Sequence, residues 1–169
     1  MPICVETLLK TCRAKRLGEA DLPAAYSLCA GNPLYYFYMH SEPSIESLRQ
    51  DLTALPPEKG PQDKYFLGLY SEDRLWAILD LIDGYPEPST AFIGFFMAEQ
   101  SIQGKGIGSA LIQELLSALR RAGFSKVRLA FVKGNPQSEA FWKKNGFLPT
   151  GAEIRKEEGY TAVVMEHPL

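Results

Sequence analysis

The feature that constrains the fold of this chain most strongly is a glycine-rich stretch at residues 103–109, which lies between a strand pattern and a helix pattern. Its alternating glycines remove the side chains that would hold a ligand away from the backbone. The helix expected to follow directs its free N–H groups and its positive dipole end toward this stretch. These features predict an anion site, most simply for phosphates. The stretch consists of Gln103, Gly104, Lys105, Gly106, Ile107, Gly108 and Ser109.

The spacing excludes two common phosphate loops. A Walker loop, G-x-x-x-x-G-K-[S/T], needs a glycine where Glu99 stands and a Ser or Thr where Gly106 stands. A dinucleotide-binding loop, G-x-G-x-x-G, needs two residues between its last glycines, but here only Ile107 separates them. A pyrophosphate loop of another kind and a glycine turn that only caps a helix are the readings left.

Composition excludes several function classes. The chain has 169 residues, which suits a single domain, 1–169, with a sizeable core. A net charge of −2 gives no general attraction to nucleic acid, and no stretch has the apolar length of a membrane span. Residues 1–15 lack the apolar core of a signal peptide, and Cys4, Cys12 and Cys29 have no metal-ligand spacing. We therefore expect a cytoplasmic protein with reduced thiols, and no metal, nucleic acid or membrane as partner.

Hydrophobic periodicity predicts an α+β (mixed α/β) domain with a mostly antiparallel sheet of about six to seven strands, flanked by about four helices. A short aromatic segment is expected at residues 34–40, and Ser44 is a candidate N-cap. The predicted strands cover residues 3–9, 12–17, 64–70, 75–82, 90–98, 126–132, 147–151, 153–156 and 160–166. The predicted helices cover residues 19–30, 45–55 and 106–122, with one more beginning at residue 136.

A second motif follows the glycine stretch about thirty residues later, at residues 135–147. Asn135 and Pro136 predict a helix start, an aromatic pair and a basic residue follow, and a Gly-Phe pair ends the motif. Together with a strand, a Gln-x-x-Gly-x-Gly loop and a helix, this motif resembles the GNAT (GCN5-related N-acetyltransferase) superfamily. The resemblance is strongest over residues 90–147 and rests only on the order of elements before that. It implies the GNAT fold.

The resemblance also implies an acetyl-CoA (coenzyme A) cofactor. Backbone N–H groups of the loop would bind the pyrophosphate, and the pantetheine arm would lie where the fourth strand bulges and splays from the fifth. Asn135 would bond this arm, cap its helix, or do both; Phe141 would line the groove or the core. The expected cofactor-binding residues are Phe96, Met97, Ala98, Gln103, Gly104, Lys105, Gly106, Ile107, Gly108, Ser109, Asn135 and Phe141.

Asp80 is the candidate catalytic base. It interrupts an apolar run, and the hairpin between the third and fourth strands would place it opposite about Gly94, near the expected thioester. Burial there would raise its pKa toward neutrality, as a base requires. The alternative is a structural Asp bonded to the backbone or to an Arg. Family members commonly use a tyrosine after the position of Phe141 as the acid, but Trp142 stands there. Its indole cannot supply a proton at useful pH, so we interpret it as a packing residue.

The resemblance places the acceptor pocket near the aromatic segment, where Tyr35, Tyr36, Tyr38 and His40 cluster. These tyrosines would contact a substrate or cover the core, and His40 is a second candidate base. The first function expected is transfer of an acetyl group to a primary amine of a small molecule or peptide. The alternative, motivated by Trp142, is a CoA-binding sensor with weak or no turnover. Family members are often dimers, so a homodimer is one expected assembly.

Overall fold

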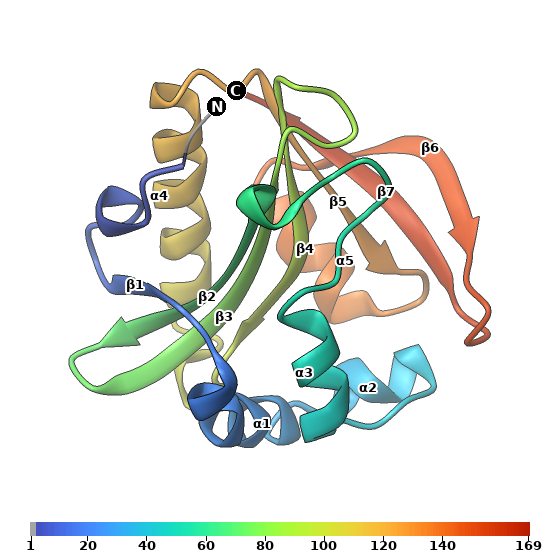
Figure 1. Ribbon diagram of the computed structural model, residues 1–169. Coiled ribbons are helices and arrows are strands. Elements are labelled where there is room, and N and C mark those ends of the chain that lie inside the picture. Colours follow the sequence, from blue (N-terminus) through green and yellow to red (C-terminus); the bar gives the residue numbers. More distant parts are fainter. Residues whose placement is uncertain (1–2) are drawn as a thin grey trace.

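The computed structural model describes residues 3–169, which form one mixed sheet with helices on both faces (Figure 1). The strand order is β1-β2-β3-β4-β5-β7-β6, and all neighbouring strands are antiparallel except β4 and β5. The strands are β1 (Arg13–Arg16), β2 (Lys64–Ser71), β3 (Arg74–Asp83), β4 (Thr90–Ala98), β5 (Lys126–Val132), β6 (Leu148–Arg155) and β7 (Thr161–Pro168).

Helices follow the signals that their sequences carry. Ser44 caps the third helix by accepting a bond from the N–H of Ser47, and Asn135 caps the fifth in the same way from two N–H groups. The α-helices are α1 (Leu22–Ala30), α2 (Pro33–Met39), α3 (Ile45–Asp51), α4 (Ile107–Arg121) and α5 (Pro136–Lys144). Short 3₁₀ turns cover Val5–Thr7, Glu19–Asp21, Pro61–Asp63 and Gln100–Ile102.

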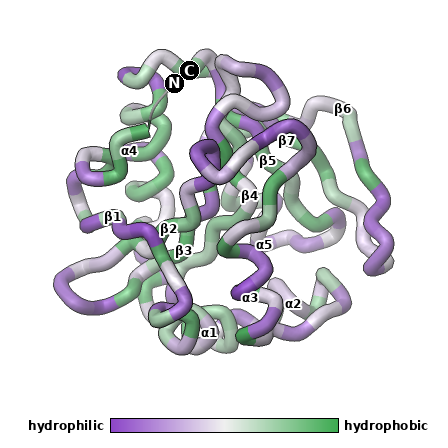
Figure 2. Tube along the Cα trace, in the orientation of Figure 1, coloured by the Kyte–Doolittle hydropathy of each residue, from purple (hydrophilic) through white to green (hydrophobic). Residues whose placement is uncertain are grey.

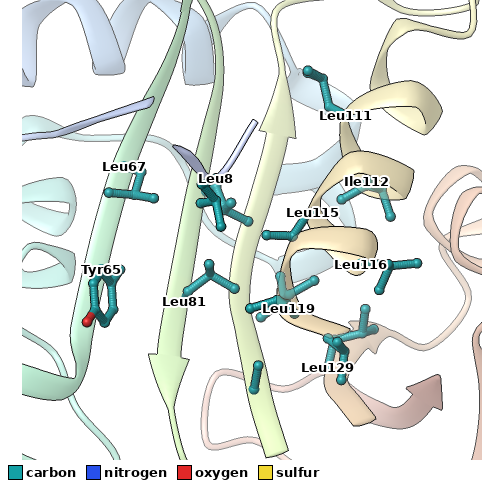
Figure 3. Close-up of a cluster of buried hydrophobic side chains, with 14 of the residues drawn as sticks. Leu8, Tyr65, Leu67, Leu81, Leu111, Ile112, Leu115, Leu116, Leu119 and Leu129 are labelled. Atoms are coloured by element: carbon teal, nitrogen blue, oxygen red, sulfur yellow. The ribbon is translucent and has the colours of Figure 1, made fainter. Parts of the chain in front are cut away.

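The larger core lies between the sheet and the face that α4 and α5 cover. The apolar stripe of α4 repeats at helical spacing, and Figure 3 shows Leu115 and Leu119 pointing from this helix toward the neighbouring strands. The same cluster contains Tyr65 and Leu67 of β2 and Leu81 of β3, and Leu8 joins it from the N-terminal segment. The α4 residues concerned are Leu111, Ile112, Leu115, Leu116 and Leu119, each at most 3% exposed.

A second core covers the opposite face of the sheet. Buried residues of α1 and α3 pack there against Phe66 of β2, Ile78 of β3 and Met97 of β4. Figure 2 shows the result along the chain, with hydrophobic colours in the central strands and α4 and hydrophilic colours in most connecting loops. Because alternate residues of a strand face opposite sides, both cores share the same central strands. None of the helices in residues 3–169 has both the length and the apolar character needed to span a bilayer.

Two expectations from the sequence need correction, and the structure assigns a helix to the aromatic segment, for which none was predicted. Residues 3–9 were expected to form a strand, but they contain the 3₁₀ turn Val5–Thr7, and their apolar side chains fold back on the larger core. The aromatic segment is a helix, α2, because Pro33 sits at its first position, where a missing N–H costs nothing. The two short strands expected at 147–151 and 153–156 form one strand, β6, which has an irregularity between Pro149 and Glu153.

Candidate active site

The site begins where β4 and β5 separate. These parallel strands are paired only from Thr90 to Ile93 of β4, and β4 then continues to Ala98 without β5 beside it. A bulge marks the point of divergence: Leu81 of β3 pairs with Ile93 and Asp80 with Phe95, which leaves Gly94 without a partner in the register. The bulge therefore precedes Phe96, Met97 and Ala98, the strand residues expected at the site. Beyond it, one edge of β4 is free of β5.

The separation opens a cleft of about 360 Å³ between β4, the glycine loop and α5. Most of the expected cofactor residues line it, which brings together segments that lie far apart in the sequence. The lining residues are Asn32, Tyr35, Phe96, Met97, Ala98, Gln103, Gly104, Gly106, Gly108, Ser109, Asn135, Gln137, Ser138, Ala140, Phe141, Trp142 and Lys144. Lys105 and Ile107 were also expected but are not among them: Lys105 is exposed, and Ile107 packs against the larger core.

The glycine loop has the form of an anion cradle. Gly104 and Gly106 have φ angles of +75° and +80°, which side-chain-bearing residues adopt only with strain, and a Cβ added at either would meet no atom within 4 Å. The space beside the backbone is therefore open. Gly106 is the residue before α4, and the first N–H groups of that helix have no carbonyl partner within it. These N–H groups and the helix dipole favour an anion at the cleft.

Gly108 has a different role, because it lies inside the first turn of α4. A Cβ added there would come within 3.4 Å of the Phe141 ring, so a larger residue would press on α5. Phe141 in turn stacks on Phe96 with ring centroids 5.9 Å apart and contacts Trp142 edge-on. Trp142 is only 8% exposed and belongs to the larger core, which confirms its interpretation as a packing residue. The aromatic wall of the cleft is thus continuous with the core.

Asn135 caps α5 and leaves its side-chain amide toward the cleft. Its Oδ1 accepts bonds from the N–H groups of Gln137 and Ser138, which confirms the N-cap. Its Nδ2 donates to no residue that the structure describes, although Asn135 is only 2% exposed and lines the cleft. This amide is therefore available to a ligand in the cleft.

Gln103 does not point outward to an anion but joins three parts of the site. Its Nε2 donates to Oδ1 of Asn32 at 2.6 Å and to the Ala98 carbonyl at 2.8 Å, and its Oε1 accepts from Gln137 at 3.2 Å. Sequence reasoning missed Asn32 and Gln137. The contact between Asn32 and Gln103 spans 71 positions, and Asn-Pro before a helix reads only as a local helix start.

Asp80 lies beneath the bulge, on the face of the sheet that α1 and α3 cover. A Cβ added at Gly94 would lie 2.6 Å from its Oδ2, so the carboxylate occupies the space that this glycine leaves. The same oxygen accepts from Nζ of Lys64 at 2.9 Å, and both side chains are largely buried. Oδ1 is buried without a hydrogen-bond partner. Asp80 is not among the described residues that line the cleft.

The environment of Asp80 fits a group that exchanges protons near neutrality. Burial raises its pKa to about 6, while Lys64 opposes this shift by favouring the carboxylate. Burial also raises the pKa of Asp51 on α3, and Lys64 opposes that shift too. Lys64 therefore pairs with Asp80 and also favours the ionised form of Asp51. Lys64 was not recognised as a site residue from the sequence. Its position in β2, two residues before the buried Phe66, indicates that both side chains lie on the same face of the sheet.

The residues expected at the acceptor pocket line three different depressions of the surface. Tyr35 lines the cleft and touches Phe95 edge-on, with ring centroids 5.7 Å apart. Tyr38 and His40 line a separate groove of about 280 Å³ together with Lys133 and Tyr160. Tyr36 lines a third groove, and burial raises the pKa of both Tyr35 and Tyr36, which keeps their hydroxyls protonated. Within residues 3–169, no group of three or more His, Cys, Asp or Glu residues could hold a metal ion.

Solved structures share this architecture. An acetyltransferase from Thermus thermophilus is 22% identical and superposes with a TM-score of 0.75, over 95% of this chain and 99% of that one. An acetyltransferase from Salmonella typhimurium that modifies the N-terminal serine of ribosomal protein L7/L12 is 17% identical, with a TM-score of 0.72 over 97% and 98%. The enzyme AAC(6')-Ib, in complex with ribostamycin and coenzyme A, is 16% identical, with a TM-score of 0.70 over 94% of both chains.

At these identities the structural likenesses show the fold alone, and none of the curated proteins matches the sequence significantly. The sequence itself carries a further finding. The model of the acetyltransferase (GNAT) family matches residues 27–147, which include the cleft, the glycine loop and the second motif. The chain belongs to the GNAT family of acetyltransferases.

Proposed function

We propose that this protein, as one domain over residues 1–169, is an N-acetyltransferase that transfers the acetyl group of acetyl-CoA to a primary amine of a small molecule or peptide. The observation that carries the proposal is the cleft, in which a glycine cradle at a helix start adjoins the free edge of a strand. A cofactor with a diphosphate and an extended amide-bearing arm needs both features. Acetyl-CoA is such a cofactor.

The residues present fit this cofactor. Gly104 and Gly106 leave the space beside the loop open, and the first turn of α4 supplies N–H donors to a diphosphate. The edge of β4 from Phe96 to Ala98 can pair with the pantetheine arm as with an added strand, and Nδ2 of Asn135 is a further donor. Lys144 adds a positive charge at the wall of the cleft. Bound acetyl-CoA supplies an acyl group activated as a thioester.

The chain must then supply a proton acceptor for the amine. Asp80 suits this role because its pKa of about 6 leaves it largely ionised at neutral pH, and its Oδ1 lacks a donor. Gly94 is exposed and carries no side chain, so the carboxylate is reached from the bulge. Tyr35 stands between the cleft and Phe95 and would contact the acceptor. Trp142 cannot donate a proton, so its position supplies no acid to the departing thiolate.

The acceptor class follows less directly. The Salmonella relative modifies a protein N-terminus, and the structure of AAC(6')-Ib contains ribostamycin, so proteins with this fold accept both a protein and a small molecule. In this chain, the separate groove is lined by Tyr38, His40 and Tyr160 together with Lys133, whose ammonium is paired with Glu153. We place the body of the acceptor in this groove. Homodimerisation, common in the family, is the proposed assembly.

Two measurements test the proposal. Isothermal titration with CoA should give binding at one site per chain. Thiol release from acetyl-CoA should then rise above the hydrolysis background with at least one member of an amine panel that contains polyamines, aminoglycosides and peptides with free N-termini. Absence of CoA binding would refute the cofactor assignment, whereas binding without any amine-dependent release would refute the transferase assignment.

The second candidate function is a CoA-binding sensor with little or no turnover. It is favoured by the buried Trp142 at the position of the usual acid and by the ion pair that engages one oxygen of Asp80. The same two measurements separate the candidates, because a sensor would bind CoA in the titration and leave the amine panel unreacted.

A further inference from the structure

Asn32 is the feature of the site that its local sequence does not explain. It precedes Pro33 at the start of α2, the position of an N-cap, yet its side chain makes no capping bond. Its Nδ2 instead donates backward to the Leu28 carbonyl at 2.9 Å and across the molecule to the Ala98 carbonyl at 3.2 Å. Because Asn32 does not use its side chain to cap α2, its role in the structure is the hydrogen bonds that it makes with distant residues.

The distant partners are the two ends of the short connection, residues 98–103, that joins β4 to the glycine loop. Ala98 is the last residue of β4, and Gln103 is the first residue of the glycine stretch. Oδ1 of Asn32 accepts from Nε2 of Gln103 at 2.6 Å, and both side-chain amides donate to the Ala98 carbonyl. The three groups therefore form a closed triangle that holds the start of the loop against the end of the strand.

The loop itself has few other restraints. Gly104 and Gly106 have no neighbouring atoms within 4 Å of an added Cβ, and Lys105 between them is exposed. A loop with little packing keeps its binding conformation only if its ends are fixed. If the loop were disordered, ordering it on binding would cost conformational entropy and lower the affinity. Gln103 fixes the first end, and Asn32 holds the amide of Gln103 in place.

We propose that Asn32 is a positioning residue for cofactor binding, which acts through Gln103 to pre-organise the glycine loop. The inference rests on the proposed function, since it concerns the same cofactor cleft. Asn32 need not touch the diphosphate for this role. Its effect should therefore be the same on any ligand that engages the loop, whether or not the ligand carries a pantetheine arm.

The test compares binding of CoA and of its nucleotide half, 3′-phospho-ADP, by isothermal titration. Asn32→Ala should weaken both about fivefold, the factor expected for one lost hydrogen bond of ordinary strength. Gln103→Ala should do the same, and the double variant should be no more than about twofold weaker than either single variant, because both substitutions break the same Asn32–Gln103 hydrogen bond. The matched control is Gln113→Ala, which removes a side-chain amide that donates to Asn145 at 3.1 Å and does not line the cleft. Its affinity for CoA should stay within about twofold of wild type.

Several outcomes would overturn the inference. Wild-type affinity in Asn32→Ala, an effect on CoA alone, or fully multiplicative losses in the double variant would each show that Asn32 does not act through Gln103. If Asn32→Ala fails to fold, Gln103→Glu provides the measurement. This change replaces the amide donor by an oxygen that faces two acceptors, the Asn32 Oδ1 and the Ala98 carbonyl. It should therefore lower the affinity for both ligands more than Gln103→Ala does. Equal affinity of these two Gln103 variants would contradict the proposal. A wild-type protein that binds neither ligand would refute the proposed function as well.

Discussion

Gly94→Ala tests whether the bulge exists to make room for Asp80. The added Cβ would lie 2.6 Å from Oδ2 of Asp80 and 3.3 Å from its Cγ, closer than atoms of this kind approach. The carboxylate cannot yield freely, because Lys64 holds the same oxygen at 2.9 Å and both side chains are largely buried. Overpacking of this kind costs about 1–3 kcal/mol, and the cost rises to about 3–5 kcal/mol if the ion pair separates. The φ of Gly94 lies outside the left-handed region, so the cost is steric only.

Urea denaturation at neutral pH measures this cost directly. Gly18→Ala is the matched control, because a Cβ there meets nothing within 4 Å and its φ is −131°. The control should change the free energy of unfolding by less than about 0.5 kcal/mol. In an Asp80→Ala background the clash is absent, so Gly94→Ala should then cost almost nothing. A Gly94→Ala protein as stable as wild type, or one equally destabilised in both backgrounds, would refute this reasoning.

Three further predictions concern the base, the missing acid and the core. Asp80→Asn should remove the rise of the acetylation rate with pH through about 6, where the carboxylate becomes ionised, and lower the rate at pH 7 by about 10²-fold or more; an unchanged profile would exclude Asp80 as the base. Trp142→Tyr should not increase the rate of thiol release, because the indole is a buried packing group; a clear gain would show that an acid is limiting. Leu119→Ala should lower the free energy of unfolding by about 2–5 kcal/mol in urea, whereas the same change at the 66% exposed Leu148 should cost less than about 0.5 kcal/mol; similar losses at both would contradict the core assignment.

The central elements of the fold could be predicted from the sequence because their signals are local. The strands expected at 90–98 and 126–132 appear with these bounds as β4 and β5, and the helix expected after the glycine stretch is α4. Turn residues fixed the hairpin between β2 and β3, in which Ser71 pairs with Arg74. The strand predicted at residues 3–9 was wrong because the apolar residues of this segment pack against the sheet without joining it. Alternation of apolar residues alone does not distinguish such a segment from a strand.

The candidate site could be predicted only in part. The glycine loop and the Asn135 cap are continuous motifs, so their residues were found from spacing. The placement of Asp80 opposite about Gly94 also followed from strand register, and the structure pairs it with the next residue, Phe95. The bulge was expected only from the family resemblance, and the register shift between Asp80 and Leu81 locates it at Gly94.

Residues that reach the site across the fold were not found. Lys64 meets Asp80 through a diagonal contact between neighbouring strands, and Asn32 meets Gln103 across 71 positions. The contact of Asn32 leaves no periodic or short-range pattern, and the alternation of β2 indicates that Lys64 faces inward but not which residue it meets. The same holds for the acceptor side, where Tyr35 and Tyr38 lie close in sequence but line different depressions.

The most direct test of the account is the affinity of CoA for wild type and for Gly106→Glu, measured by isothermal titration. A carboxylate at this position would occupy the open space beside the loop and repel a diphosphate, in addition to the strain of a φ of +80°. Gly106→Ala is the control for that strain. The account predicts that wild type binds CoA, that Gly106→Ala binds about tenfold less tightly, and that Gly106→Glu loses about 10²-fold or more. Equal affinity of wild type and Gly106→Glu would contradict the assignment of the glycine loop as the cofactor site.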